Sequence, residues 1–367
     1  MGMAVFTYYN LYFKSIGLSS SQIGTINSIA KAVALLSLPL WGIAADYYKA
    51  NKKLLMVTVS GALISSLLFL TTESFWLLVT IMTFFLTFFL STVPLADAQL
   101  LGYLDDDGQQ YGKYRIWGSI GYTVVVAGVG YFVEKTAAVN IFYLSGLVYL
   151  LTLMIIPKLP DEDVNIKLGD LEKFKILLQK ENLFIFILFT FFINLTFETN
   201  NIYFPIYVID QGGKEFLIGI SLMIAATSEM AIFYFSEEIM LRFKLKYILL
   251  VSSLAFAFRW FLLAEFPVPA VFLVSQLLHS LTFGLFHVTA VNYINELCGK
   301  QFKSTGQNLY ATAKGISGII GSFIGGFIYQ DLGGSTLYLY MSLIAFSAGL
   351  IYFMILRNNS NIKYVGS

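Results

Sequence analysis

Eleven apolar segments of membrane-spanning length follow one another along this chain. A bilayer core is crossed by about 20 predominantly apolar residues of α-helix. Polar clusters separate the segments, which cover residues 22–46, 54–72, 75–101, 111–133, 141–157, 183–209, 216–240, 247–264, 270–295, 306–330 and 336–356. Lengths of this kind, repeated along most of the chain, predict an all-α protein embedded in a membrane.

Composition supports this prediction. Hydrophobic residues make up 57% of the 367 residues and charged residues only 12%, whereas a soluble domain carries roughly 25% charge. A soluble fold could not cover that much apolar surface, so the surface must face lipid. The net charge of +1 and the absence of a basic block interleaved with aromatic residues argue against nucleic acid as a partner.

A twelfth apolar segment, residues 1–13, is too short to cross a bilayer. We interpret it as the outer part of a first helix, because the polar turn 14–22 then lies outside the membrane. We therefore expect about twelve helices, with the first one truncated and its missing half, or an earlier start codon, upstream.

The basic residues of the loops are distributed asymmetrically. With the N-terminus inside, every loop Lys and Arg falls on the cytoplasmic side except Lys14, Lys135 and Lys214. Cytoplasmic loops carry an excess of Lys and Arg, so both termini are expected in the cytoplasm. Short loops and the lack of appended domains favour a bacterial plasma membrane.

One long polar stretch, 157–182, divides the chain, and its residues 170–180 have the pattern of an amphipathic helix. We expect a six-helix bundle at 1–157, a cytoplasmic linker at 158–182 and a second six-helix bundle at 183–367. Glycines spaced along 118–130 and 315–326 form a faint repeat, and such spacing lets helices approach closely. Two halves around a site near the membrane midplane are typical of transporters.

Ionisable residues lie inside the predicted helices, where each costs about 2.5 to 3.5 kcal/mol. They are Lys31, Asp97, Arg115, Glu198, Glu229, Arg259, His279, His287 and Lys314. Static ion pairs between helices would account for any one of them, and the collection favours a solute pathway. His279 and His287 are about 12 Å apart along one helix, too far to share a metal ion. With a single cysteine, Cys298, the chain suggests no metal site and no cofactor.

Three sequence stretches carry a resemblance to a known family. After the second predicted helix comes GIAADYYKANKK, with Gly42, Asp46, Lys49, Lys52 and Lys53, and further on come VPLADA and YGKYRIWGSIGY. They are similar to the gating loop and to helices four and five of the major facilitator superfamily, in the branch of lactose permease and the phenylpropionic acid transporters. The resemblance implies two six-helix bundles that alternate access to a central site.

The same resemblance implies site residues. In the first half it points to Asp97, Arg115 and Tyr122 as solute ligands, with Tyr122 stacking on the solute ring. In the second half SEMAIF, FRWF and LLHSLTFGLFHVTAVNYI place Glu229, Arg259 and His279 at the permease's coupling positions. The acid that carries the proton in lactose permease is replaced here by Thr282.

We therefore expect a secondary transporter, not an enzyme, that moves a sugar, a nucleoside or an aromatic or carboxylic acid by proton symport. Its expected partners are the solute, the proton and the lipid bilayer, and it is expected to act as a monomer. The candidates for proton coupling are Glu229, Glu198, His287, Lys314 and Lys31. Because of Thr282, sodium coupling and uncoupled transport stay open. The alternatives are a membrane-embedded transferase, which would use the run Asp105–Asp107, and a non-transporting receptor on the same fold.

Overall fold

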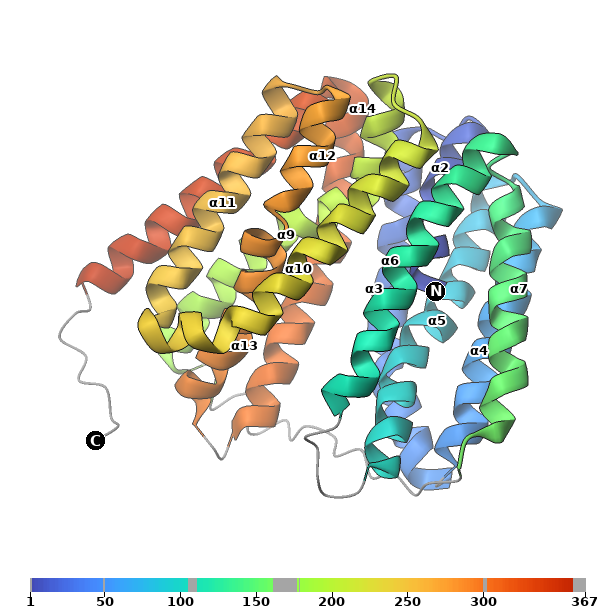
Figure 1. Ribbon diagram of the computed structural model, residues 1–367, viewed down its shortest axis with the longest axis horizontal. Helices are drawn as coiled ribbons and strands as arrows, with labels where there is room; N and C mark the ends of the chain where they lie inside the picture. The colour runs from blue at the N-terminus through green and yellow to red at the C-terminus, as the bar shows by residue number, and fades with distance from the viewer. Residues whose placement is uncertain are drawn as a thin grey trace. The chain divides into compact units, whose positions relative to one another are not determined.

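The computed structural model describes residues 2–48, 50–104, 111–160, 177, 179–299 and 302–358, and all regular structure among them is helical. The helices, the longer of which are labelled in Figure 1, are α1 (Gly2–Phe6), α2 (Tyr9–Ser15), α3 (Ser20–Tyr48), α4 (Asn51–Leu68), η1 (Phe69–Thr71), α5 (Phe75–Tyr103), α6 (Tyr111–Lys135), α7 (Asn140–Ile155), η3 (Ile156–Lys158), α9 (Glu181–Asp210), α10 (Glu215–Arg242), α11 (Leu245–Glu265), α12 (Pro269–Leu277), η4 (Ser280–Gly284), α13 (Leu285–Cys298) and α14 (Lys303–Asn358). The predicted all-α membrane fold is confirmed.

Ten helical stretches among the described residues are long and apolar enough to cross a bilayer. The last of them, Lys303–Arg357, contains one residue with non-helical geometry, Gly333, whose φ of 83° is in the left-handed region that favours glycine. Gly333 separates runs 303–332 and 334–358, which match the two segments expected there. The initial segment forms only the short helices α1 and α2, so the count of about twelve stays a prediction.

The chain forms two compact units. The first consists of residues 1–168, 199–226 and 318–332, and the second of 169–198, 227–317 and 333–367. The first therefore contains α1 to α7 together with one end of α9, one end of α10 and a middle part of α14. The division at 158–182 into two six-helix bundles stays a prediction, and the expected amphipathic helix at 170–180 lies largely outside the described residues.

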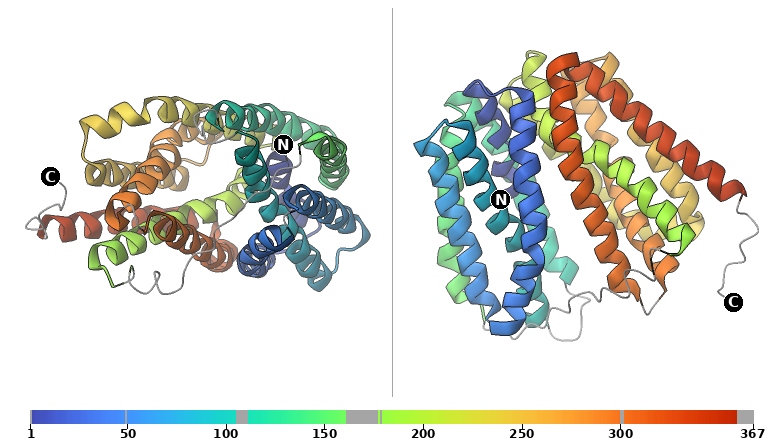
Figure 2. Two further views of the ribbon diagram at one scale, coloured as in Figure 1. Left: turned by 90° about the horizontal axis from the view of Figure 1, so that it is seen from below. Right: turned by 180° about the vertical axis from the view of Figure 1, so that it is seen from behind.

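The core of the first unit is aromatic. α3, α4, α5 and α7 pack against one another, and the short α1 and α2 lie among the longer helices, as the dark blue ribbon in Figure 2 shows. Tyr9 is completely buried and contacts Phe69, Phe85 and Phe142 at centroid distances of 4.9 to 5.6 Å. Its hydroxyl donates to Ser145 over 2.8 Å, which satisfies the one polar atom of the ring.

Helices α3 and α14 come into backbone contact within this unit. A Cβ atom at Gly24 would lie 2.4 Å from the Ser322 carbonyl oxygen, and one at Gly326 would lie 2.7 Å from the Ser20 carbonyl oxygen. Tyr203 of α9 fills the space beside the crossing, where its hydroxyl donates to the Ser322 carbonyl over 2.7 Å. Only glycine permits this approach, because any side chain would meet backbone atoms.

A second crossing of the same kind joins α6 and α10. A Cβ atom at Gly130 would lie 2.6 Å from the Glu215 carbonyl oxygen, and one at Gly219 would lie 2.9 Å from Ala127 Cα. The hydroxyl of Tyr8 lies beside both glycines and donates to the Val126 carbonyl over 3.0 Å. The tyrosine therefore occupies the space that a side chain would need.

An ion pair lies near the end of α9 in the first unit. Lys14 of α2 pairs with Asp210 of α9, and Tyr329 of α14 donates to the same carboxylate over 2.7 Å. Lys214 and Glu134 form a looser pair at 3.9 Å. Lys14 and Lys214, two of the three basic exceptions in the charge distribution, therefore each have a carboxylate partner.

The second unit is centred on α11 and α13, which pack against each other. Trp260 of α11 is completely buried, and its ring nitrogen donates to Thr196 Oγ1 of α9 over 3.0 Å. Phe189 of α9 stacks on Tyr352 of α14 at a centroid distance of 4.3 Å. These contacts hold α9 and α14 around the helices that carry the polar cluster described next.

Candidate functional site

Three helices of the second unit bring Glu229, His279 and Arg259 together. Glu229 lies on α10, Arg259 on α11, and His279 between α12 and η4. Arg259 Nη1 lies 3.1 Å from His279 Nδ1, and His279 Nε2 lies 3.4 Å from Glu229 Oε2. The carboxylate, the imidazole and the guanidinium thus form a continuous chain of polar contacts within membrane-spanning helices. The resemblance pointed to these three residues, and the structure places them in contact.

Arg259 is 1% exposed and is surrounded by neutral acceptors. Its Nη2 donates to Gln276 Oε1 over 2.6 Å, and its Nη1 donates to Thr282 Oγ1 over 3.1 Å. The Thr282 hydroxyl donates its own proton to the Leu278 carbonyl over 2.9 Å, which leaves a lone pair for the guanidinium. Thr282, noted in the sequence only as the replacement of an acid, therefore acts as an acceptor for Arg259.

The π-helical segment η4 produces this arrangement. The amide of Gly284 donates to the His279 carbonyl, five residues earlier, over 3.1 Å. Such a wide turn interrupts the α-helical spacing and is frequent at functional sites. A Cβ atom at Gly284 would lie 3.3 Å from Glu229 Cγ, so the glycine also lets α10 come close to η4.

A second pair of opposite charges lies in the same unit. Lys314 Nζ of α14 is 3.7 Å from Glu198 Oε1 of α9, and it also lies over the rings of Phe197 and Phe283 at 5.8 and 5.2 Å. His287 stacks on Phe283 at 5.3 Å. The ring of Phe283 also stacks on His279, so it joins this pair to the Glu229–His279–Arg259 cluster. No pattern in the sequence singled out Phe283 or Gln276.

The predicted site residues of the first half lie in the first unit. Lys31 on α3, Asp97 on α5 and Tyr122 on α6 are all partly buried, and each takes part in an interaction. Arg115 lies on α6, and its side chain is outside the described residues. The alternative transferase motif Asp105–Asp107 is outside them as well.

The predicted gating loop joins α3 to α4. Gly42 is within α3, and Lys52 at the start of α4 donates to the Leu159 carbonyl over 2.7 Å. Lys53 is exposed. Lys49 and the side chain of Asp46 are outside the described residues, so the motif is visible here only in part.

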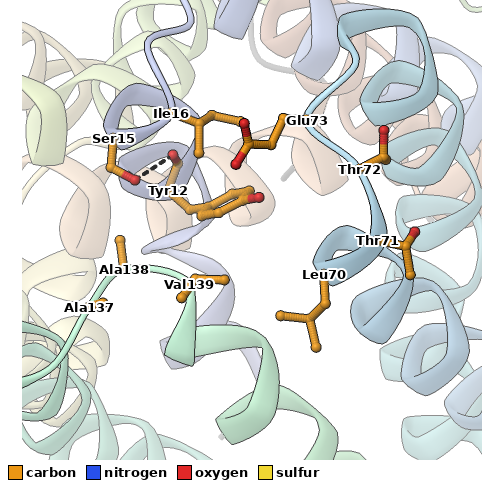
Figure 3. Close-up of a pocket in the computed structure, with 10 residues that line it drawn as sticks. All are labelled: Tyr12, Ser15, Ile16, Leu70, Thr71, Thr72, Glu73, Ala137, Ala138 and Val139. Carbon is orange, nitrogen blue, oxygen red and sulfur yellow. Dashed lines mark hydrogen bonds between the residues drawn. The ribbon is translucent and has the colours of Figure 1, made fainter.

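Figure 3 shows an open cavity of about 630 Å³ in the first unit, between the end of α2, the η1 turn and the start of α7. Tyr12 and Glu73 face it, with Thr71, Thr72 and small apolar side chains around them. None of the predicted solute residues lines this cavity. Its lining contains a single carboxylate and no basic group, so the Glu229–His279–Arg259 cluster is the better candidate site.

Helices of membrane-spanning length with ionisable groups inside them define a multi-pass membrane protein of the kind that carries solutes or ions. The chain belongs to the MFS_1-like family, whose model matches residues 3–340. The expected membership of the major facilitator superfamily is therefore confirmed.

Relatives of known sequence are transporters. The chain is 26% identical to the uncharacterized transporter YwbF of Bacillus subtilis, with 94% of this chain and 87% of the relative covered. It is 26% identical to the maltose permease of Geobacillus stearothermophilus, with coverage of 96% and 91%, and 23% identical to the probable 3-phenylpropionic acid transporter of Escherichia coli, with coverage of 93% and 90%. A transporter is thus supported over an enzyme.

Solved structures show the same fold. The nucleoside transporter NupG matches with a TM-score of 0.85 at 14% identity, over 97% of this chain and 96% of that one. A POT family transporter in complex with a thioalcohol-conjugated peptide matches with a TM-score of 0.78 at 11% identity, over 97% and 93%. At such identities the likeness concerns the fold alone.

Proposed function

We propose that this protein is a secondary transporter of a small organic solute, operating by alternating access between two six-helix bundles. The observation that carries the proposal is the Glu229–His279–Arg259 chain of polar contacts inside membrane-spanning helices, with Arg259 buried and the other two partly buried. Buried charges in such helices are costly and mark solute or ion pathways. The proposal includes twelve helices, cytoplasmic termini, a monomeric carrier and a plasma-membrane location.

The residues proposed to bind the solute are Asp97, Arg115, Tyr122, Glu229, Arg259 and His279. Arginine offers several donors in a fixed plane, which suits a carboxylate or two adjacent hydroxyl groups. Tyr122 offers a ring face for stacking. Lys31 and Lys314 add positive charge, which favours an anionic or strongly polar solute.

Three solute classes follow from the relatives and are compatible with such a site: sugars, aromatic acids and nucleosides. Counterflow in proteoliposomes, with labelled maltose, 3-phenylpropionate and uridine as probes, tests all three. We expect labelled probe to accumulate only when the liposomes are preloaded with the same unlabelled compound. Accumulation that does not depend on preloading would contradict a carrier.

Replacing Arg115 by lysine is expected to reduce solute uptake at least tenfold. Lysine keeps the charge and loses the planar fork, so a two-point contact with the solute becomes a single one. Initial uptake rates of Arg115→Lys, normalised to protein in the membrane, measure the effect. Arg242→Lys, the same substitution at a side chain that is 69% exposed, is the control and should transport normally. Normal uptake by Arg115→Lys would remove Arg115 from the proposed site.

Coupling to protons is proposed to use Glu229 or Glu198, with His287, Lys314 and Lys31 as further candidates. We expect solute addition to wild-type proteoliposomes to cause alkalinisation of the outside medium. The variant that removes the coupling carboxylate, Glu229→Gln or Glu198→Gln, should lose the pH change and retain counterflow. A wild-type protein that moves solute without a pH change would contradict proton symport and leave sodium coupling or facilitated transport.

A further inference from the structure

The hydrogen bonds of Arg259 also bear on the protonation of the neighbouring His279. We propose that Gln276 and Thr282 are positioning residues, which orient the Arg259 guanidinium so that it holds His279 as a neutral imidazole with its proton on Nε2, facing Glu229. The inference concerns the site of the proposed function, and it can be tested without any solute.

The first step is the contact between Arg259 Nη1 and His279 Nδ1, at 3.1 Å. A guanidinium carries five N–H donors, has no acceptor and does not lose its proton in proteins. In a hydrogen bond between these two atoms the imidazole nitrogen must therefore be the acceptor. Nδ1 then carries no hydrogen, and a neutral ring has its proton on Nε2.

The second step is the other side of the ring. His279 Nε2 lies 3.4 Å from Glu229 Oε2, which is within reach of a hydrogen bond from Nε2–H to the carboxylate. A doubly protonated imidazole would direct its Nδ1–H against a guanidinium N–H at 3.1 Å. The contact with Glu229 is therefore one between a neutral N–H donor and the carboxyl group, and the imidazole lies between Arg259 and Glu229.

The third step is the orientation of the guanidinium. Gln276 is 1% exposed, and its Oε1 accepts from Arg259 Nη2 over 2.6 Å. The donor-only guanidinium also determines which end of the amide faces it, because the NH2 end has no acceptor lone pair. Thr282 accepts from Nη1 on the other side, so two acceptors from one helical stretch orient the plane that meets His279.

The backbone carbonyl of Gln276 accepts a hydrogen bond from a neighbouring helix. Ser228 Oγ of α10 donates to this carbonyl over 3.2 Å, one residue before Glu229. Gln276 thus links the helix that carries Arg259 to the helix that carries Glu229. The link to Arg259 is made by the side-chain amide and the link to α10 by the backbone carbonyl.

The chain offers a direct measurement, because it contains only two histidines, His279 and His287. Protein labelled with ¹⁵N-histidine and reconstituted in liposomes gives two sets of imidazole resonances in solid-state NMR, in which protonated and unprotonated nitrogens are well separated. The spectrum of His279→Asn assigns the two sets. We expect wild-type His279 to show a protonated Nε2 and an unprotonated Nδ1 as its single dominant state at neutral pH.

In Gln276→Leu the guanidinium loses an acceptor, and we expect the single state of His279 to be replaced by both tautomers or by a protonated ring. Thr282→Val should have the same effect to a smaller extent. Gln276→Glu keeps an acceptor oxygen and should keep the wild-type pattern. Gln307→Leu removes the same kind of side chain from α14, where it bonds to Val291 and Asn295, and should leave His279 unchanged.

Three results would overturn the inference. They are a wild-type His279 that is protonated on Nδ1, a Gln276→Leu spectrum identical to that of the wild type, and an equal change in Gln276→Leu and Gln276→Glu. The proposed transport function fails separately, if no probe shows counterflow that depends on preloading. The NMR result and the transport result are therefore independent.

Discussion

Replacing Gly24 by leucine is expected to abolish solute exchange while leaving an inserted protein. Even a Cβ atom at this position would lie 2.4 Å from the Ser322 carbonyl and 2.5 Å from the Tyr203 hydroxyl. Forcing extra atoms into packed contacts costs roughly 1 to 3 kcal/mol, and a backbone carbonyl can yield only if α14 moves. In the proposed alternating-access mechanism, the close contact between α3 and α14 forms in one conformation of the transport cycle. A variant that cannot form this contact should therefore not complete the cycle.

The control for this prediction is Gly128→Leu on α6. A Cβ atom at Gly128 would meet nothing within 4 Å, and the residue is exposed on a membrane-spanning helix. Probe counterflow and the melting temperature of the purified proteins should both be near wild type for Gly128→Leu. Normal exchange by Gly24→Leu would show that close contact between α3 and α14 is not needed for transport.

Replacing Arg259 by methionine is expected to lower solute affinity by a factor of roughly 10 to 100. A hydrogen bond that involves a charged group contributes about 1.5 to 3 kcal/mol, and each 1.4 kcal/mol is a factor of ten. Three acceptors, Gln276, His279 and Thr282, lose their donor. Arg259→Lys should lose at least tenfold, because an ammonium group cannot reach three acceptors in one plane.

Arg242 provides the matched control. It lies at the end of the neighbouring helix α10, pairs with Glu238 one turn away, and is 69% exposed. Exposed pairs of this kind contribute only about 0.2 to 1 kcal/mol, so Arg242→Lys should bind solute normally. The measurement is the concentration dependence of counterflow for each probe. Equal affinity in Arg259→Met and the wild type would remove Arg259 from the site.

The break at Gly333 is a structural feature that the sequence pattern predicted. Two apolar segments were expected at 306–330 and 336–356, and α14 has left-handed geometry at Gly333 between them. Membrane-spanning length and a glycine in a polar stretch suffice for such a prediction, because both are local properties. The same reasoning did not predict the division of residues 1–13 into α1 and α2, since that short segment has no regular spacing to indicate a break.

The cluster around Arg259 shows what sequence patterns could not predict. Family resemblance pointed to Glu229, Arg259 and His279, and no pattern in the sequence indicated Gln276. Glutamine in a membrane-spanning helix has many ordinary roles. The importance of Gln276 depends on its 2.6 Å contact with Arg259, which precedes it by 17 residues and lies on another helix. The π-helical segment η4 changes the helical phase between Gln276 and Gly284, and simple 3.6-residue spacing cannot anticipate it.

Segment length and apolar composition were enough to predict a bundle of membrane helices, because both follow from the thickness and the low polarity of the bilayer. Which side chains contact one another became visible in the folded structure. Glu229, His279 and Arg259 come from three different helices, and the glycine contacts of α3 with α14 join residues about 300 positions apart. Such contacts depend on the packing of whole helices against one another, which no local stretch of sequence encodes.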